Sequence, residues 1–283
     1  MTNFTILLFD NGSLQPEATF RLRALSKQLS DAISMKVKPV SLLHSCKIKP
    51  ESLNGVPATI IRRRFKEAIQ MGEKKIICVP LFLGPSLAIT EYLVELIDEA
   101  KSLDPEMTIH VAEPLCGSDV NHPDERLVMI LKELIEAAIT SSNANYQNIV
   151  LVDHGSPIEK MAFLRNAIAE KLSVLFRERR LKITASSMER REGEAYVFNE
   201  PLLETIPDYL GLKPNESLIV AMFFLMPGRH AGDGGDVDAI LQSLQKQNKI
   251  CSYKKTELIT THPMIIDLLA DRVKSVLINK LEA

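Results

Sequence analysis

The chain has 283 residues, 46% of them hydrophobic, and a formal net charge of -2, so its length favours two domains of about 140 residues each. The charge is divided evenly between the two halves and excludes the strongly basic surface of a nucleic-acid binder. No apolar run approaches the ~18 residues of a membrane span, the start lacks a secretory signal pattern, and the cysteines lack C-x-x-C spacing, so we expect a cytoplasmic protein without a membrane partner.

The predicted elements alternate between strands and helices. Apolar or β-branched runs typical of strands stand at 5–10, 37–43, 75–83 and 108–115, and again at 148–153, 182–188, 217–225 and 249–258. After the first strand of each set, apolar residues recur at spacings of three and four, as in an amphipathic helix. These stripes are Ala18, Leu22, Leu25, Leu29 and Ile33, and then Met161, Leu164, Ile168, Leu172 and Leu175. Each set closes with a long helix opened by a His-Pro pair, at His122 and His262.

The second set repeats the first. FTILLFDNGS, at 4–13, returns as QNIVLVDHGS, at 147–156, an offset of 143, and IICVPLFL, at 76–83, returns as LIVAMFFL, at 218–225. So long a period indicates two copies of one domain. We therefore expect an α/β protein with two similar doubly wound parallel-sheet domains, residues 1–143 and 144–283, related by an internal repeat and facing each other across a pseudo-twofold axis.

Ionisable residues gather where strands of the second copy end. His154 follows its first strand, Glu189 its second and His230 its third. Ligands of open parallel sheets bind at the carboxyl ends of the strands, beside the switch in strand order, and the order 2-1-3-4 would make these three strands neighbours. We therefore predict that the three side chains converge on one rim. In the first copy, Asn11 replaces His154 and Ala88 replaces His230, so its site is degenerate.

Two motifs carry a family resemblance. LVDHGSP, at 151–157, followed by AMFFLMPGRHAGDGGDV, at 221–237, resembles the sirohydrochlorin chelatases, class II tetrapyrrole chelatases whose strands end in G-H-G-S and read P-L-F-L-x-x-G-x-H. FDNGS, at 9–13, and VPLFLGPSLAITE, at 79–91, look like altered forms of the same motifs, so the resemblance covers the whole chain. The departures are Asp153 for Gly, Met222 for Pro, and a first half with neither histidine.

The resemblance implies a lyase that inserts Co2+ or Fe2+ into sirohydrochlorin without ATP, within cobalamin or sirohaem biosynthesis. The divalent ion, with Ni2+ a further candidate, is then a substrate, and no organic cofactor is expected. The implied metal-binding and catalytic residues are His154, His230 and Glu189, because imidazole suits these metals, leaves coordination positions open and accepts protons. Candidate contacts for the ring and its carboxylates are Ser13, Ser156, Gly228 and Arg229.

Other interpretations stay open. A half-degenerate site also permits a metal or tetrapyrrole carrier without turnover. A zinc hydrolase could use the same two histidines, although the chain lacks H-x-x-x-H and H-x-x-E-H spacing at them. Structurally, His154 could cap a turn and Glu189 could belong to a solvated charge run. Because the second copy replaces a partner subunit, we expect a monomer.

Overall fold

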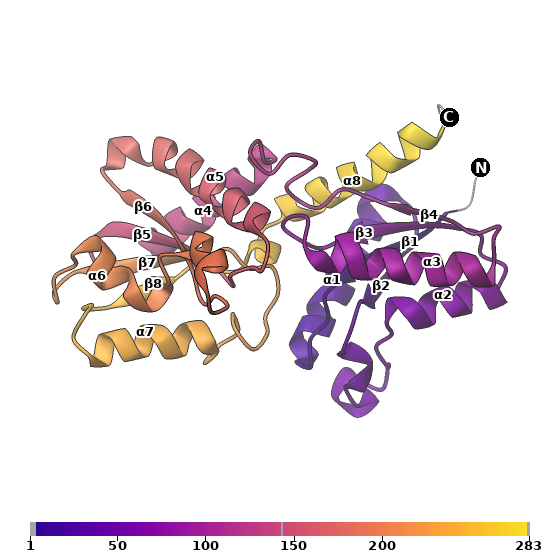
Figure 1. Cartoon of the computed structure of the whole chain (residues 1–283), viewed down its shortest axis with the longest axis horizontal. Helices are drawn as coiled ribbons and strands as arrows, with labels where there is room; N and C mark the ends of the chain where they lie inside the picture. Colours follow the sequence, from indigo (N-terminus) through magenta and orange to yellow (C-terminus); the bar gives the residue numbers. More distant parts are fainter. Residues whose placement is uncertain (1–3, 143, 282–283) are drawn as a thin grey trace. The chain divides into compact units, whose positions relative to one another are not determined.

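The computed structural model describes residues 4–142 and 144–281 (Figure 1). Eight strands lie within these residues: β1 (Thr5–Asp10), β2 (Val37–Ser41), β3 (Lys75–Pro80), β4 (Thr108–Val111), β5 (Tyr146–Asp153), β6 (Lys182–Ser187), β7 (Ser217–Met222) and β8 (Tyr253–Lys255). They form two all-parallel sheets with the orders β2-β1-β3-β4 and β6-β5-β7-β8. The expected α/β class, repeat and strand order are confirmed.

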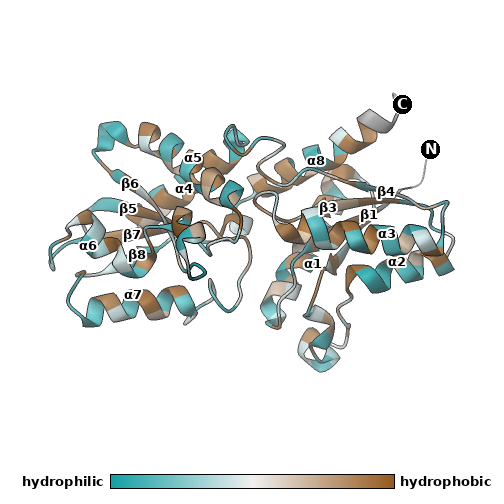
Figure 2. Cartoon of the chain, in the orientation of Figure 1, coloured by the Kyte–Doolittle hydropathy of each residue, from teal (hydrophilic) through white to brown (hydrophobic). Residues whose placement is uncertain are grey.

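The α-helices of the described residues flank these sheets. They are α1 (Pro16–Ile33), α2 (Ile61–Gln70), α3 (Leu93–Leu103), α4 (Glu125–Thr140), α5 (Glu159–Leu175), α6 (Ile206–Leu210), α7 (Asp236–Lys246) and α8 (Met264–Leu281). In Figure 2 the central strands are predominantly hydrophobic, whereas helices such as α7 carry both kinds of residue. None of the helices described is long and apolar enough to cross a membrane.

The predicted apolar stripes face the cores for most of their length. Leu22, Leu25 and Leu29 of α1 are buried, as are Leu164, Ile168 and Leu172 of α5. The second stripe ends sooner than predicted, because Leu175 is 44% exposed. Each fully buried leucine contributes roughly 1.5–3 kcal/mol relative to an exposed one, so these faces anchor their helices.

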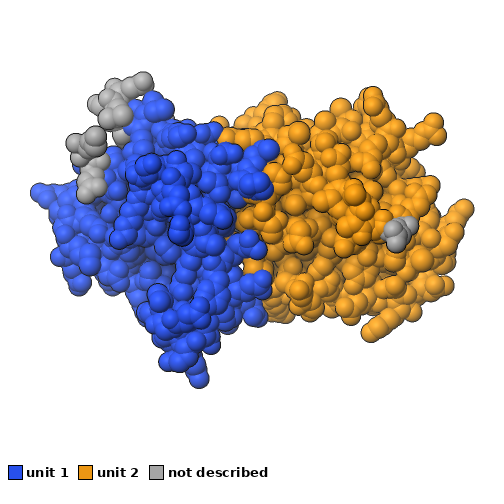
Figure 3. Space-filling view, turned by 180° about the vertical axis from the view of Figure 1, so that it is seen from behind, with its two compact units in different colours: residues 1–115, 263–283 blue, residues 116–262 orange. Residues whose placement is uncertain are grey.

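The chain divides into two compact units whose boundaries differ from those of the repeat (Figure 3). Unit 1 comprises residues 1–115 with 263–283, and unit 2 comprises residues 116–262. The repeat predicts a division into 1–143 and 144–283, but the closing helix of each copy belongs to the core of the other unit. Thus α8 packs along α1 and on β3, whereas α4 packs along α5 and on β7 and β8.

The physical reason for this exchange lies in the repeat itself. The chain passes from one unit to the other between the last strand and the closing helix of each copy, at Leu115–Cys116 and at His262–Pro263. Because the two copies offer similar uncovered sheet faces, the apolar face of either closing helix can be buried on either sheet. The sequence pattern predicts that each helix is buried but does not select its sheet.

Candidate active site

Three neighbouring strands of unit 2 position the candidate residues. The central strand, β5, pairs with β6 on one side and with β7 on the other. His154 directly follows β5, Glu189 stands two residues after β6, and His230 lies in the loop between β7 and α7. All three residues belong to unit 2. The carboxyl ends of the strands at the switch in order therefore carry the ionisable groups.

The structure brings the two imidazoles into contact. The ring centroids of His154 and His230 are 4.4 Å apart and their planes are inclined by 50°. Oε1 of Glu189 lies 3.2 Å from Nε2 of His154. The side chains of His154, Glu189 and His230 are 46%, 59% and 33% exposed, so a ligand can reach them. No group of three or more His, Cys, Asp or Glu side chains in the described residues has the arrangement of a metal site. The imidazole pair is therefore assembled, with Glu189 beside His154.

A tight turn aims His154 at this rim. Gly155 has a φ of +93°, and a Cβ there would collide with the carbonyl oxygen of Glu189, so the position requires glycine. The backbone N–H of Glu189 donates to the carbonyl of His154 over 3.2 Å, which ties the two predicted residues together. Unit 1 keeps the same turn, with Gly12 at a φ of +91° against the carbonyl of Leu43. The backbone frame therefore persists in the copy that lacks the imidazoles.

A buried hydrogen-bond network lies beneath the His154 turn. Arg165 of α5 is fully buried and donates to Ser187, to Asp153 and to the carbonyl of Asn199. The hydroxyl of Ser187 donates to Asp153 over 2.6 Å. Burial raises the pKa of Asp153, and the charge of Arg165 opposes that rise. The Asn199 side chain accepts from the N–H of Ser156 over 2.9 Å and donates to its carbonyl over 3.0 Å. The network therefore joins the loops that follow β5 and β6.

The start of α7 holds His230. Nδ1 of the ring lies 2.7 Å from Oδ2 of Asp236, the first residue of the helix. The backbone N–H of Val237 donates to the carbonyl of His230 over 3.2 Å. At Gly235 a Cβ would press on the carbonyl oxygens of Arg229, His230 and a neighbouring glycine. The lack of a side chain at Gly235 is therefore required by the loop's own backbone.

The predicted substrate contacts are divided between the units. Ser13 belongs to unit 1, whereas Ser156, Gly228 and Arg229 belong to unit 2. The N–H of Ser156 is already donated within the protein, so only its hydroxyl has donor capacity left for a ligand. The carbonyl of Gly228 accepts an N–H from its own loop. Arg229 is the most accessible of the four, with its side chain 81% exposed and its Nε 3.3 Å from Asp236.

Sequence reasoning missed Asp236 and Arg165. Asp236 could have been found as an acid in the first turn of a helix, six residues after His230. Arg165 stands four residues after Met161 and three before Ile168, so it shares their helix face. An arginine inside an apolar stripe indicates a buried partner, because an unpaired buried charge is costly.

Unit 1 keeps the buried carboxylate of this network but not the arginine. Asp10 and its neighbour Ser41 end β1 and β2 as their counterparts end β5 and β6. By the offset of 143, Leu22 takes the place of Arg165. Oδ1 of Asp10 is buried and has no hydrogen-bond partner among the described residues. Burial raises the pKa of Asp10 to about 6, although hydrogen bonds from Ser41 and the backbone favour the ionised form.

Asp10→Asn is expected to remove a pH-dependent loss of stability. Burial raises the folded-state pKa of Asp10 from 3.8 to about 6. The stability contributed by its protonated side chain is therefore fully present below pH 3.8 and is lost as the pH rises through about 6. The loss is on the order of 3 kcal/mol, from 1.36 kcal/mol per pKa unit. Urea unfolding at pH 5 and at pH 8 would show Asp10→Asn stabilised over the parent at pH 8 and closer to it at pH 5. Equal differences at both pH values would contradict the assignment.

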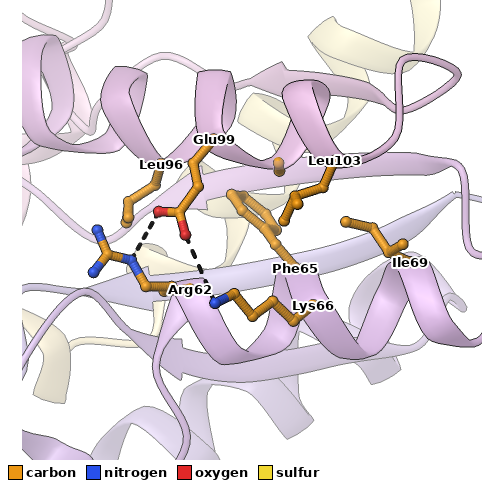
Figure 4. A pocket seen from close by; sticks show the side chains of 8 residues that line it. Arg62, Phe65, Lys66, Ile69, Leu96, Glu99 and Leu103 are labelled. Carbon is orange, nitrogen blue, oxygen red and sulfur yellow. Dashed lines mark ion pairs between the residues drawn. The ribbon is translucent and has the colours of Figure 1, made fainter.

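A pocket in unit 1 contains none of the candidate residues. It lies between α2 and α3 and is drawn in Figure 4. Glu99 pairs there with Arg62 over 2.9 Å and with Lys66 over 3.8 Å, beside the side chain of Phe65. The charged side chains that line this pocket pair with one another, so the pocket offers no separate catalytic centre.

Comparisons with known proteins agree with the fold. The family model CbiX matches residues 5–137. The structure of SirB from Bacillus subtilis with Fe3+ superposes with a TM-score of 0.71 at 17% identity, over 96% of this chain and 95% of that one. The sirohydrochlorin chelatase SirB from Bacillus subtilis subspecies spizizenii, in complex with cobalt, gives 0.67 at 16% identity, over 96% and 94% of the two chains. No curated protein matches the chain.

The family match and the histidine pair fall in different halves of the sequence. Residues 5–137 include Ser13 but neither histidine of the pair. The likeness to the two SirB structures covers both halves and shows the shared fold. The CbiX match and the shared fold agree with the resemblance carried by the sequence motifs.

Proposed function

We propose that this chain inserts Co2+ or Fe2+ into sirohydrochlorin without ATP, as a cobaltochelatase or ferrochelatase. The observation that carries the proposal is the contact of the His154 and His230 rings, whose centroids are 4.4 Å apart at the ends of neighbouring strands. The CbiX match and the SirB structures, one with Fe3+ and one in complex with cobalt, support it.

The imidazole pair suits a metal that has to be passed on. Imidazole binds cobalt, iron and nickel, and two protein ligands leave coordination positions for the pyrrole nitrogens. Both histidines are partly exposed, so the tetrapyrrole can approach the ion while the imidazoles still bind the ion. Glu189, 3.2 Å from Nε2 of His154, is close enough to share the ion as a third ligand. A closed set of four ligands would hold the metal too firmly for transfer.

Proton balance gives the same residues a second role. Insertion of M2+ forms bonds from the metal to the pyrrole nitrogens and displaces two N–H protons from the ring. The two imidazoles that release the ion regain free lone pairs and can each take one of these protons. The site then exchanges one doubly charged ion for two imidazolium charges, so its net charge is unchanged. Glu189 can stabilise the imidazolium formed at His154.

Anaerobic incubation of the purified chain with sirohydrochlorin and Co2+ tests this function. The expected result, without ATP, is conversion of the metal-free absorption spectrum into that of the metallated ring at a rate that rises with protein concentration. Fe2+ and Ni2+ in parallel reactions would rank the metals. A rate equal to that of the protein-free reaction for all three ions would refute catalysis.

The carrier interpretation is favoured by one observation, the lack of a group of three metal-binding side chains in the described residues. A carrier would bind Co2+ or sirohydrochlorin stoichiometrically and leave the absorption spectrum of the ring metal-free after repeated additions of metal. Turnover beyond one ring per protein would exclude it. The same reaction therefore separates the two functions.

We further propose that the chain works as a cytoplasmic monomer. The internal repeat supplies within one chain two sheets of the same strand order, which otherwise would need two subunits. Its ligands are then the divalent ion and the tetrapyrrole. The even charge distribution supports the absence of a nucleic-acid partner.

A further inference from the structure

Asp236 meets the ring of His230 on the side opposite the atom that a metal would use. We propose that Asp236 is a positioning residue that holds His230 in the tautomer protonated on Nδ1, so that Nε2 offers its lone pair to the ion. This inference rests on the proposed function only for its consequence, because the tautomer can be measured without any chelatase reaction.

The contact itself determines the direction of the hydrogen bond. Nδ1 of His230 lies 2.7 Å from Oδ2 of Asp236, which is a short and strong contact. An ionised carboxylate has no proton to donate, so Nδ1 must carry the hydrogen. Arg229 approaches the same oxygen at 3.3 Å and is the weaker partner of the two. Asp236 is also the first residue of α7, so the helix fixes the position of its carboxylate.

The backbone of His230 is tied to the same helix end. The N–H of Asp236 donates to the carbonyl of Arg229, and the N–H of Val237 donates to the carbonyl of His230, each over 3.2 Å. Val237 is fully buried, which anchors this first turn to the core. Ring and backbone are therefore held by one rigid element, and the direction of Nε2 follows from the position of α7.

His154 provides an internal comparison. Its Nδ1 lies 3.1 Å from the carbonyl oxygen of Gly155, and its Nε2 lies 3.2 Å from Oε1 of Glu189, so acceptors stand at both nitrogens and these contacts do not select one tautomer. The two rings differ in the nitrogen that meets a carboxylate, which is Nδ1 in His230 and Nε2 in His154, so only the carboxylate at His230 leaves Nε2 for the ion.

The degenerate copy supports a functional link between the acid and the imidazole. By the offset of 142, Ala88 replaces His230 and Val94 replaces Asp236. Val94 is 47% exposed, so the acid was not exchanged for a core residue. The acid and the ring it contacts are therefore absent together from unit 1.

Long-range ¹H–¹⁵N NMR of the histidine rings tests the proposal on the metal-free full chain at pH 8.5, where a histidine of ordinary pKa is neutral. The expected result is a protonated Nδ1 and an unprotonated Nε2 at His230. Asp236→Ala should shift this ring toward the Nε2-protonated form that free histidine prefers, whereas Asp236→Asn should keep the Nδ1 proton, because the amide oxygen still accepts it. Asp233→Asn, which removes a negative charge from the exposed loop just before α7, is the matched control and should leave the ring unchanged.

Binding of Co2+ alone and turnover complete the test. Asp236→Ala should weaken Co2+ binding and lower kcat by about 10–100-fold, the usual cost of removing a partner of a metal-binding histidine. Asp236→Asn should recover a large part of both, since a merely structural role would not follow the tautomer. An Nε2-protonated His230 in the parent chain would overturn the inference even if the chain is a chelatase. The predicted tautomers together with no metal insertion would instead uphold the inference and refute the proposed function.

Discussion

His154→Ala and His230→Ala should each lower the rate of metal insertion at least about tenfold. The double variant should be little slower than the slower of the two single variants. The two rings are in contact, so they are placed to hold the same ion. Removal of either ring breaks the pair, and residues that act as one unit give non-additive losses. Initial rates with sirohydrochlorin and Co2+, measured for the parent, both single variants and the double variant, give the coupling directly.

His122→Ala is the matched control for this cycle. His122 is also a histidine of unit 2, but its side chain is 84% exposed and pairs with Asp119. Its removal should leave the rate within about twofold of the parent, as expected for a surface change far from special features. Losses at His154 and His230 that multiply independently would show that the rings do not share one ion.

The largest expected effect on stability is that of Arg165→Leu, which should lower the free energy of unfolding by about 3–5 kcal/mol. The substitution leaves the buried carboxylate of Asp153 without its guanidinium partner. It also removes donors to Ser187 and to the carbonyl of Asn199. Leucine is the residue that unit 1 carries at the corresponding position, so its shape suits a helix of this kind. Chemical denaturation at neutral pH measures the change.

A second substitution tests the cause of this loss. Asp153→Asn in the Arg165→Leu background should recover a substantial part of the stability, because no unpaired charge then remains buried. Arg179→Leu is the control, since Arg179 is a 46% exposed arginine of the same unit that pairs with Glu136 at the surface. Its effect should be under about 1 kcal/mol. If the double variant were as unstable as Arg165→Leu alone, the buried charge would not be the cause.

The sheet topology could be predicted because its signals are local. Continuous apolar runs, helical stripes and the repeated FTILLFDNGS segment depend on short stretches of chain, and the strands form in the expected order 2-1-3-4. The rims follow from that order, so the approach of His154 to His230 could be anticipated although 75 residues separate them. The exchanged helices could not be anticipated, because the apolar faces of α4 and α8 do not specify which sheet they cover.

Two contacts of the site that escaped prediction depend on the conformation of the segments between the strands. Asp236 reaches His230 only because the loop between them folds back on itself. The tight turns of this loop appear in the sequence only as glycines, which do not indicate which side chains come together. Asn199 ends a short 3-10 helix, Glu194–Asn199, and reaches Ser156 across 43 positions. Side-chain type predicted which groups could do chemistry, whereas the groups that orient them depend on three-dimensional contacts.

The exchange of α4 and α8 makes the two halves of the sequence mutually dependent. A break in the chain near residue 143 would leave the first fragment without α8, the cover of β3, and carrying α4, whose apolar face belongs on β7 and β8. Each fragment would expose one uncovered sheet face and the apolar face of one unpacked helix. The helix that would cover each sheet is carried by the other fragment. Such fragments are obligate complements, so a gene for the imidazole-bearing half alone would not encode a complete hydrophobic core.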